Sequence, residues 1–182
     1  PRDERSVSRV EGELAPEGKL DARAYDAAGV PATPGPPPTP AIPPTPRATY
    51  GTSINVFDSQ GVAVPVTLYF QKTATDNEWE VYDSLDLAAP SRGTITFDNN
   101  GAITGPVAPA PATGFGLTLS VDPSPPNPNN LPAFNVLVKL DDVTQFGSKF
   151  AVSDLSQDGY ASGELTSINI SNDGMVMASY SN

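Results

Sequence analysis

One short turn pattern recurs between runs of alternating apolar and polar residues, and it constrains the fold more than any other feature. In each copy an Asp or Ser is followed by two small or polar residues and a Gly, at positions 26–29, 58–61, 98–101 and 171–174. Such an Asp or Ser accepts a backbone N–H two residues on, and the Gly adopts the left-handed conformation that closes a hairpin. The pattern therefore predicts antiparallel strand pairs, least clearly at 26–29, because the residues before that copy alternate poorly.

The segments between these corners alternate with the period of two that a strand requires. In residues 61–70 every second residue from Val62 to Phe70 is apolar, and Pro65 on the opposite face predicts an edge position or a bulge. The same alternation is found in residues 78–83, 93–97, 115–121, 134–140, 165–170 and 175–180. No window has apolar residues at helical spacing without an interrupting Pro or Gly. We therefore predict an all-β fold, an antiparallel barrel or sandwich built from hairpins.

The composition excludes several kinds of chemistry. The chain has no Cys and no His, which rules out disulfides, Cys- or His-ligated metals, thiol nucleophiles and Ser-His-Asp triads. Its formal net charge of −11 disfavours binding to nucleic acid or to an anionic membrane surface. No apolar run approaches the roughly 20 residues that cross a bilayer as a helix. We expect no nucleic-acid or membrane partner, and carboxylates are the only groups left for catalysis.

One acidic segment, residues 154–165, partly matches the spacing of a calcium-binding loop. Positions 1, 3, 5 and 6 of such a loop are filled as required by Asp154, Ser156, Asp158 and Gly159. The closing carboxylate is out of register, because Glu164 falls at position 11 and Leu165 occupies position 12. We therefore expect a polar turn between strands here and no metal site.

The carboxylates give no better indication of an active site. Glu78 and Glu80 lie two apart on a predicted strand and so share a face, as alternating Glu residues on a solvated strand do. Glycosidases instead hold two carboxylates on either side of a sugar, in a cleft. There is also no Gly-rich phosphate loop. We predict that the chain is not an enzyme and binds no cofactor.

Prolines are concentrated in two segments, residues 30–46 and 123–132. Runs of this kind are extended, and their prolines donate no backbone hydrogen bonds. The first segment is interpreted as a semi-rigid strap between two parts of the structure. A disordered tail is the alternative that composition alone leaves open.

Two ordered blocks resemble the bacterial flagellar hook protein family. The later block, residues 143–182, carries the segments TQF (144–146), QDGY (157–160), GEL (163–165), DG (173–174) and YSN (180–182). The earlier block, residues 53–82, has a strand, a DSQG turn, a strand ending in YFQKT, and then NEWEVY. The resemblance covers about residues 50–182, with a variable stretch at 84–130, whereas residues 1–49 match weakly. Distal-rod proteins share parts of the later block.

The resemblance implies a structural subunit of the hook, a helical tube outside the cell that bends while it transmits motor torque to the filament. It implies export by the flagellar secretion route, with other copies of the same chain and the rod and hook–filament junction proteins as partners. The chain looks like a middle fragment without the family's terminal helices, and such a fragment is expected to be monomeric in solution. The expected division is 1–29 as strands of an inner β-domain, 30–49 as a Pro-rich connection, 50–158 as the outer β-domain and 159–182 as the returning inner hairpin.

Five residues are candidates for function within that interpretation. Tyr69, Tyr82 and Leu137 occupy strand positions that face away from the predicted core, so we predict that they contact neighbouring subunits. Gly159 and Gly163 are the predicted hinge between the outer domain and the hairpin. Two alternative functions remain: an acidic all-β module that binds carbohydrate or acts as an adhesin, and a distal-rod relative of the hook protein.

Overall fold

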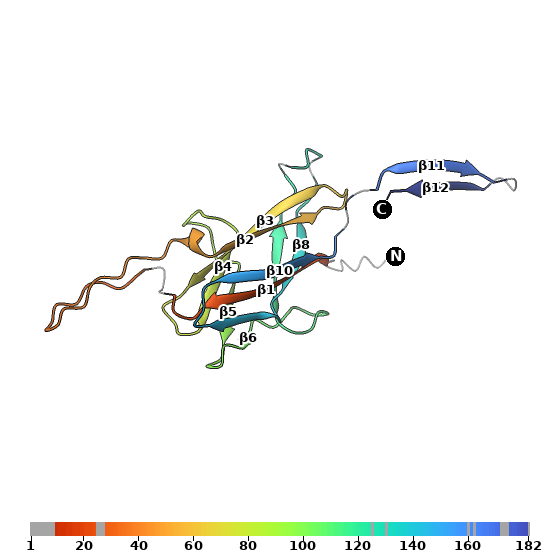
Figure 1. The fold of residues 1–182 in the computed structure, drawn as a ribbon. Coiled ribbons are helices and arrows are strands. Elements are labelled where there is room, and N and C mark those ends of the chain that lie inside the picture. The colour runs from red at the N-terminus through yellow and green to blue at the C-terminus, as the bar shows by residue number, and fades with distance from the viewer. Residues whose placement is uncertain are drawn as a thin grey trace, which may run out of the picture.

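A computed structural model describes residues 10–24, 28–124, 126–129, 131–159, 161, 163–171 and 175–181. Two sheets pack face to face, and a separate two-stranded hairpin follows them (Figure 1). The first sheet is an antiparallel meander of β2 (Gly51–Phe57), β3 (Ala63–Lys72), β4 (Glu78–Tyr82), β5 (Gly93–Phe97) and β6 (Ile103–Gly105). The second contains β10 (Ala151–Gln157), β1 (Val10–Asp21), β8 (Phe134–Lys139) and β7 (Gly116–Val121) in that order, with β9 (Val143–Phe146) also paired to β1.

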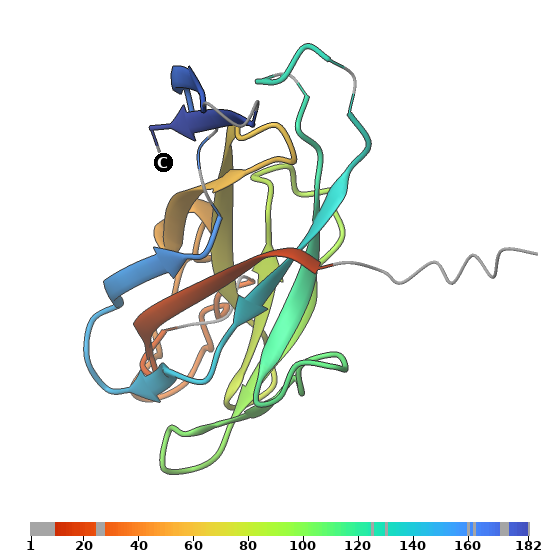
Figure 2. The same ribbon diagram turned by 90° about the vertical axis from the view of Figure 1, so that its right-hand side faces the viewer.

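The core lies between the two sheets. Most of the alternating apolar residues predicted to share a face between residues 61 and 140 are buried together, whereas those of residues 165–170 and 175–180 are exposed. Both sheets contribute to one cluster: Leu20, Val56, Val64, Val66, Leu68, Phe70, Trp79, Val81, Ile95, Phe97, Leu117, Leu119, Val121, Phe134, Val136, Val138, Leu140 and Val143. Figure 2 shows the two layers from the side. The all-β prediction is confirmed, and of the two predicted architectures the described strands form the sandwich.

Not every strand pair is antiparallel. β1 pairs in parallel with β8 through its first half, as at Gly12 and Val136, and in parallel with β9 through its second half, as at Gly18 and Val143. Its other edge pairs antiparallel with β10. β1 is far in sequence from β8 and β9, and no hairpin connects it to them and fixes its direction. The turn pattern therefore could not predict this pairing.

The place of β1 also bears on the predicted domains. Residues 1–29 were expected to join the returning hairpin at 159–182 in an inner domain. The structure instead places β1 inside the second sheet of the sandwich, and Leu20 is 2% exposed in the shared core. The described part of that segment therefore belongs to the sandwich. The division of a longer protein into inner and outer domains stays a prediction.

Two of the predicted corners are described completely, and both have the predicted form. The carboxylate of Asp58 accepts the N–H groups of Gln60 (2.8 Å) and Val62 (3.0 Å), and Gly61 has φ of 74°. Asp98 repeats this arrangement, accepting two N–H groups at 2.8 and 2.9 Å, and Gly101 has φ of 80°. The copies at 26–29 and 171–174 fall partly outside the described residues.

Pro65 lies at a local sheet edge, as predicted. Its segment of β3 pairs with β2, where Asn55 is its partner, whereas β4 pairs only with the later part of β3, from Tyr69 to Lys72. Proline is tolerated there because its missing N–H would otherwise point to an unpaired edge.

The first Pro-rich segment joins β1 to β2 as an arm that runs outward and returns (Figure 1), rather than as a strap. Paired backbone bonds hold its two limbs together. Val30 and Ile42 exchange bonds of 2.9 and 2.8 Å, and Thr33 and Thr39 exchange two of 3.1 Å. The arm ends at the single turn η1 (Arg47–Thr49).

Among the described residues, no helix has the length and apolar character needed to cross a membrane.

Candidate functional site

A buried polar junction links the two sheets. Trp79 on β4 is 0% exposed and donates its Nε1–H to Oε1 of Gln145 on β9, at 2.7 Å. The amide nitrogen of Gln145 donates to Oδ1 of Asn77, also at 2.7 Å, so that both ends of the Gln145 side chain are bonded. Asn77 itself has a positive φ of 57° in the turn before β4. The bond between Trp79 and Gln145 is shielded from water and fixes the position of one sheet relative to the other.

The junction brings together the two sequence blocks that resemble the hook family. Gln145 is the centre of the TQF segment, and Asn77 and Trp79 belong to the NEWEVY segment, 66 residues earlier in the chain. The corner at 98–101 completes the junction, because Gly101 accepts a bond of 2.9 Å from the Gln145 N–H. The sequence does not predict this contact, since nothing local to either block identifies its partner.

Tyr69 and Tyr82 are neighbours in register on β3 and β4. Tyr69 is half-buried, with its ring over Gly51 of β2. Tyr82 is 8% exposed, because the guanidinium of Arg47 lies 3.5 Å from its ring centroid. Burial raises the pKa of the Tyr82 hydroxyl, and its 2.6 Å bond to Glu80 raises it further, against the nearby charge of Arg47. Tyr82 is therefore covered by the residue that ends the arm.

Arg47 is the functional candidate that sequence reasoning missed. It is 7% exposed, and one of its nitrogens donates to the carbonyls of Ser84 (3.2 Å) and Asp86 (2.6 Å). A guanidinium stacked on an aromatic ring and bonded to carbonyls is held firmly. A lone Arg after a Pro-rich run gives no local signal of such burial. Arg47 anchors the base of the arm to the sandwich.

Leu137 is also buried, at 4% exposed, although it points away from the core between the sheets. The chain between β6 and β7 folds over it, so that Gly116 lies close to both Leu137 and the buried Ala108. Tyr82 and Leu137 thus offer little free surface, and Tyr69 offers some. A role for the three residues in subunit contacts stays a prediction.

The two predicted hinge glycines flank the link between the sandwich and the last hairpin. The Gln157 side chain holds Gly159 from both sides, accepting its N–H at 2.7 Å and donating to its carbonyl at 3.2 Å. Phe57 of β2 lies against the same glycine. Gly163 precedes the hairpin base, where the Ser181 N–H donates to the carbonyl of Glu164 at 2.9 Å. A hinge at Gly159 and Gly163 stays a prediction.

The hairpin of β11 (Leu165–Ile170) and β12 (Val176–Tyr180) stands apart from the sandwich (Figure 1). Its register puts Ile168 opposite Ala178 and Ile170 opposite Val176, so these side chains share one face. Ile170 is 73% exposed and Val176 is 66% exposed. A two-stranded hairpin with an uncovered apolar face is marginally stable in water. This face is therefore a candidate contact surface.

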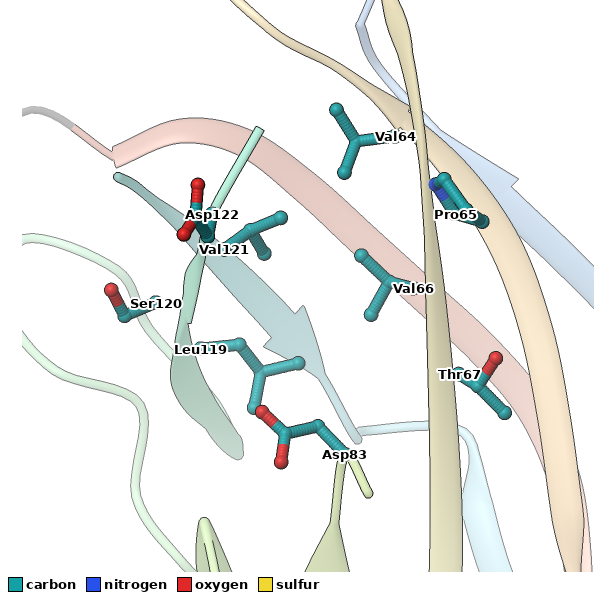
Figure 3. A pocket seen from close by; sticks show the side chains of 9 residues that line it. All are labelled: Val64, Pro65, Val66, Thr67, Asp83, Leu119, Ser120, Val121 and Asp122. Carbon is teal, nitrogen blue, oxygen red and sulfur yellow. The ribbon is translucent and has the colours of Figure 1, made fainter. Parts of the chain in front are cut away.

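An open cleft of about 160 Å³ lies where the unpaired part of β3 approaches β7, the edge strand of the other sheet. Figure 3 shows the apolar side chains of Val64, Val66, Leu119 and Val121 around the space, and the carboxylates of Asp83 and Asp122 near its rim. The remaining lining residues are Pro65, Thr67 and Ser120. The lining offers no pair of groups arranged for nucleophilic or acid–base catalysis.

The carboxylates of the two corner residues, Asp58 and Asp98, have a structural role. Asn127, in the second Pro-rich segment, is 1% exposed and donates its amide to Asp58 at 2.6 Å. Burial alone would raise the pKa of Asp58, but the bonds from Asn127 and from the turn N–H groups outweigh it, so the pKa lies below its ordinary value. Hydrogen bonds from Ala102 and Asn100 likewise lower the pKa of Asp98. In the described part of the chain, no group of three or more acidic side chains is placed to hold a metal ion.

Acid is expected to destabilise the sandwich from about pH 4 downward, near the pKa of Asp in an unfolded chain. The pKa values of Asp58 and Asp98 are lower in the folded chain, so their stabilising effect is complete above that pH and is lost as the pH falls through the folded values. Melting temperatures between pH 7 and pH 3 measure the effect. Asp58→Asn should flatten the curve and exposed Asp76→Asn should not; equal curves for both variants would contradict the assignment.

Comparison with known proteins gives matches to flagellar proteins. A family model described as the flagellar basal body protein FlaE D2 domain matches residues 19–160. The flagellar hook protein FlgE of Salmonella typhimurium is 34% identical over 146 residues, and that of Escherichia coli is 36% identical over 135 residues. Each alignment covers 71% of this chain and 31% of the relative. The chain therefore spans about a third of the length of these relatives.

Two solved structures are also similar. A 32 kDa fragment of the flagellar hook protein FlgE from Caulobacter crescentus has a TM-score of 0.41 at 22% identity, covering 60% of this chain and 46% of that one. The Helicobacter pylori flagellar hook protein FlgE2 has a TM-score of 0.38 at 15% identity, covering 79% of this chain and 31% of that one.

Proposed function

The chain belongs to the flagellar hook protein family, whose D2 domain it matches over residues 19–160, and from that premise we propose that it is part of a structural subunit of the bacterial flagellar hook. The family match over most of the chain is the observation that carries the proposal. The family is a structural one, and we propose that the chain has no catalytic activity. We further propose that the whole protein is exported and polymerises with other copies outside the cell, between the rod and the hook–filament junction.

The architecture supports this proposal. A sandwich locked by the Trp79–Gln145–Asn77 junction resists internal deformation, as a densely packed core does. A subunit of a bending tube needs rigid bodies joined by flexible connections, so that neighbours can shift without unfolding. The alternative of a carbohydrate-binding or adhesin module is not favoured, since the matched relatives are hook proteins.

We propose that the apolar face of the β11–β12 hairpin is covered by another part of the whole protein. Residues 159–182 would then form the return from the sandwich to a domain nearer the tube axis. The exposure of Ile170 and Val176 supports this, because an apolar hairpin face needs a covering layer.

The direct test uses the full-length protein. Expressed in a strain whose own hook gene is deleted, it should restore hooks visible by electron microscopy, and the purified protein should polymerise into tubes. A full-length protein that reaches the cell exterior but neither polymerises nor restores hooks would contradict the proposal. Binding of that monomer to cell-surface carbohydrate would favour the adhesin alternative.

The hinge makes a separate prediction. Replacing Gly159 and Gly163 together with Ala should impair swimming more than it lowers the melting temperature. A Cβ on Gly159 would stand 2.8 Å from Oε1 of Gln157, and both substitutions narrow the accessible backbone angles. Gly147→Ala is the matched control, because its added Cβ would meet only Cδ of Arg23, at 4.0 Å. Normal swimming in the double variant would show that the hinge lies elsewhere.

A further inference from the structure

The Pro-rich arm, residues 30–46, projects from the sandwich with a fixed shape. Two pairs of backbone hydrogen bonds tie its limbs together, and prolines fix φ at about half of its positions. Gly29, with φ of 71°, lies so close to the returning limb that a Cβ there would stand 2.7 Å from the backbone nitrogen of Pro44. At the other end Arg47 is fixed over Tyr82. A loop that only connected β1 to β2 would not need paired limbs, a close approach at Gly29 or a buried Arg47 at its end.

The surface of the arm differs from the surface of the sandwich. Residues 30–41 are all exposed, and no residue from 28 to 46 carries a charge. The whole chain has 21 acidic and 10 basic residues, so the acidic excess lies outside the arm. Two copies of this chain therefore repel each other through their sandwiches and not through their arms.

The length of the arm matters for the same reason. Its limbs of about eight residues reach roughly 25 Å at the polyproline rise of 3.1 Å per residue. The screening length is about 8 Å at physiological salt. A contact at the arm tip thus leaves two acidic sandwiches about three screening lengths apart, where their repulsion is largely cancelled. A pre-ordered arm also loses little conformational entropy on docking.

We infer that the arm is a contact element that docks on a neighbouring copy of this chain. The inference rests on the proposed function, because a polymer supplies neighbouring copies at fixed distances, and it adds a contact that the family match does not assign. The docked surface of the neighbour is expected to be apolar or neutral, since proline-rich segments bind through ring packing and carbonyl acceptors.

Cross-linking of assembled full-length protein tests the inference. The chain has no Cys, so Pro38→Cys at the arm tip gives it a single thiol, to which a photoactivatable cross-linker can be attached. Mass spectrometry of mixed polymers, made from isotope-labelled and unlabelled subunits, should find links from residue 38 to a second copy. Ala74→Cys, on an exposed turn of the sandwich, is the labelling control. Links confined to the same chain, or to a different protein, would overturn the inference.

A charge variant gives an independent readout. Pro34→Glu with Pro38→Glu should raise the concentration needed for polymerisation roughly tenfold, the effect of about 1.4 kcal/mol. Ala74→Glu with Ala88→Glu adds the same charge at exposed sandwich positions and should change the concentration needed for polymerisation less than twofold. Equal effects of the two pairs would refute a role for the arm while leaving the proposed function intact. If unmodified protein forms no polymer at all, the proposed function fails and the arm inference fails with it.

Discussion

Gly101→Ala is expected to destabilise the sandwich by about 3 kcal/mol or more, enough to leave a marginal domain largely unfolded. Two costs add at this position. With φ of 80° the backbone conformation alone costs an L-residue about 1–2 kcal/mol. The added Cβ would also collide with the backbone carbonyl of Gln145, which cannot move without breaking the bond between Gln145 and Gly101.

Gly61→Ala is the matched control for this prediction. Gly61 closes the equivalent corner with φ of 74°, and it is half-exposed. It should show the conformational cost of about 1–2 kcal/mol without the collision against β9. Denaturant unfolding of both variants measures the difference. If both lose the same free energy of unfolding, docking of the 98–101 corner on β9 contributes nothing to stability.

Gln145→Leu is expected to cost about 2–4 kcal/mol of unfolding free energy. Leucine has nearly the volume of glutamine, but it leaves the buried Trp79 N–H and the partly buried side-chain oxygen of Asn77 without their partner, and a buried unsatisfied group costs about 1–3 kcal/mol. Trp79 is the chain's single tryptophan, so its fluorescence reports both the local environment and global unfolding. Gln71→Leu is the control, because Gln71 is less deeply buried and its bond to Arg47 is long, at 3.4 Å.

A double-mutant cycle separates the hydrogen bond from packing. Trp79→Phe removes the donor and some volume, and Gln145→Leu removes the acceptor. The double variant should be more stable than the sum of the single effects predicts, by about 1–2 kcal/mol, because no unpaired indole N–H remains. Strict additivity would mean that the bond between Trp79 and Gln145 does not stabilise the junction, and that the family motifs meet there for packing alone.

The sequence by itself determined the features whose cause lies within a few residues. The corners at 58–61 and 98–101 have the predicted form because an Asp side chain bonds to N–H groups two and four positions on, and a Gly supplies the positive φ. The strands follow because alternation decides which side chains can share a buried face. Pro65 was placed at an edge because a missing N–H is a local property. Family membership, too, was predicted from ordered motifs.

Only the tertiary structure decided which distant segments meet. The direction of β1 and its place between β10 and β8 depend on pairings across more than 100 residues. Gln145 reaches Trp79 across 66 residues, and Arg47 covers Tyr82 from the end of the arm. The predicted strap is wrong, because prolines predict an extended backbone but not where it turns back. Such contacts are selected by the free energy of the whole core, in which each segment competes for many partners, so no local pattern encodes them.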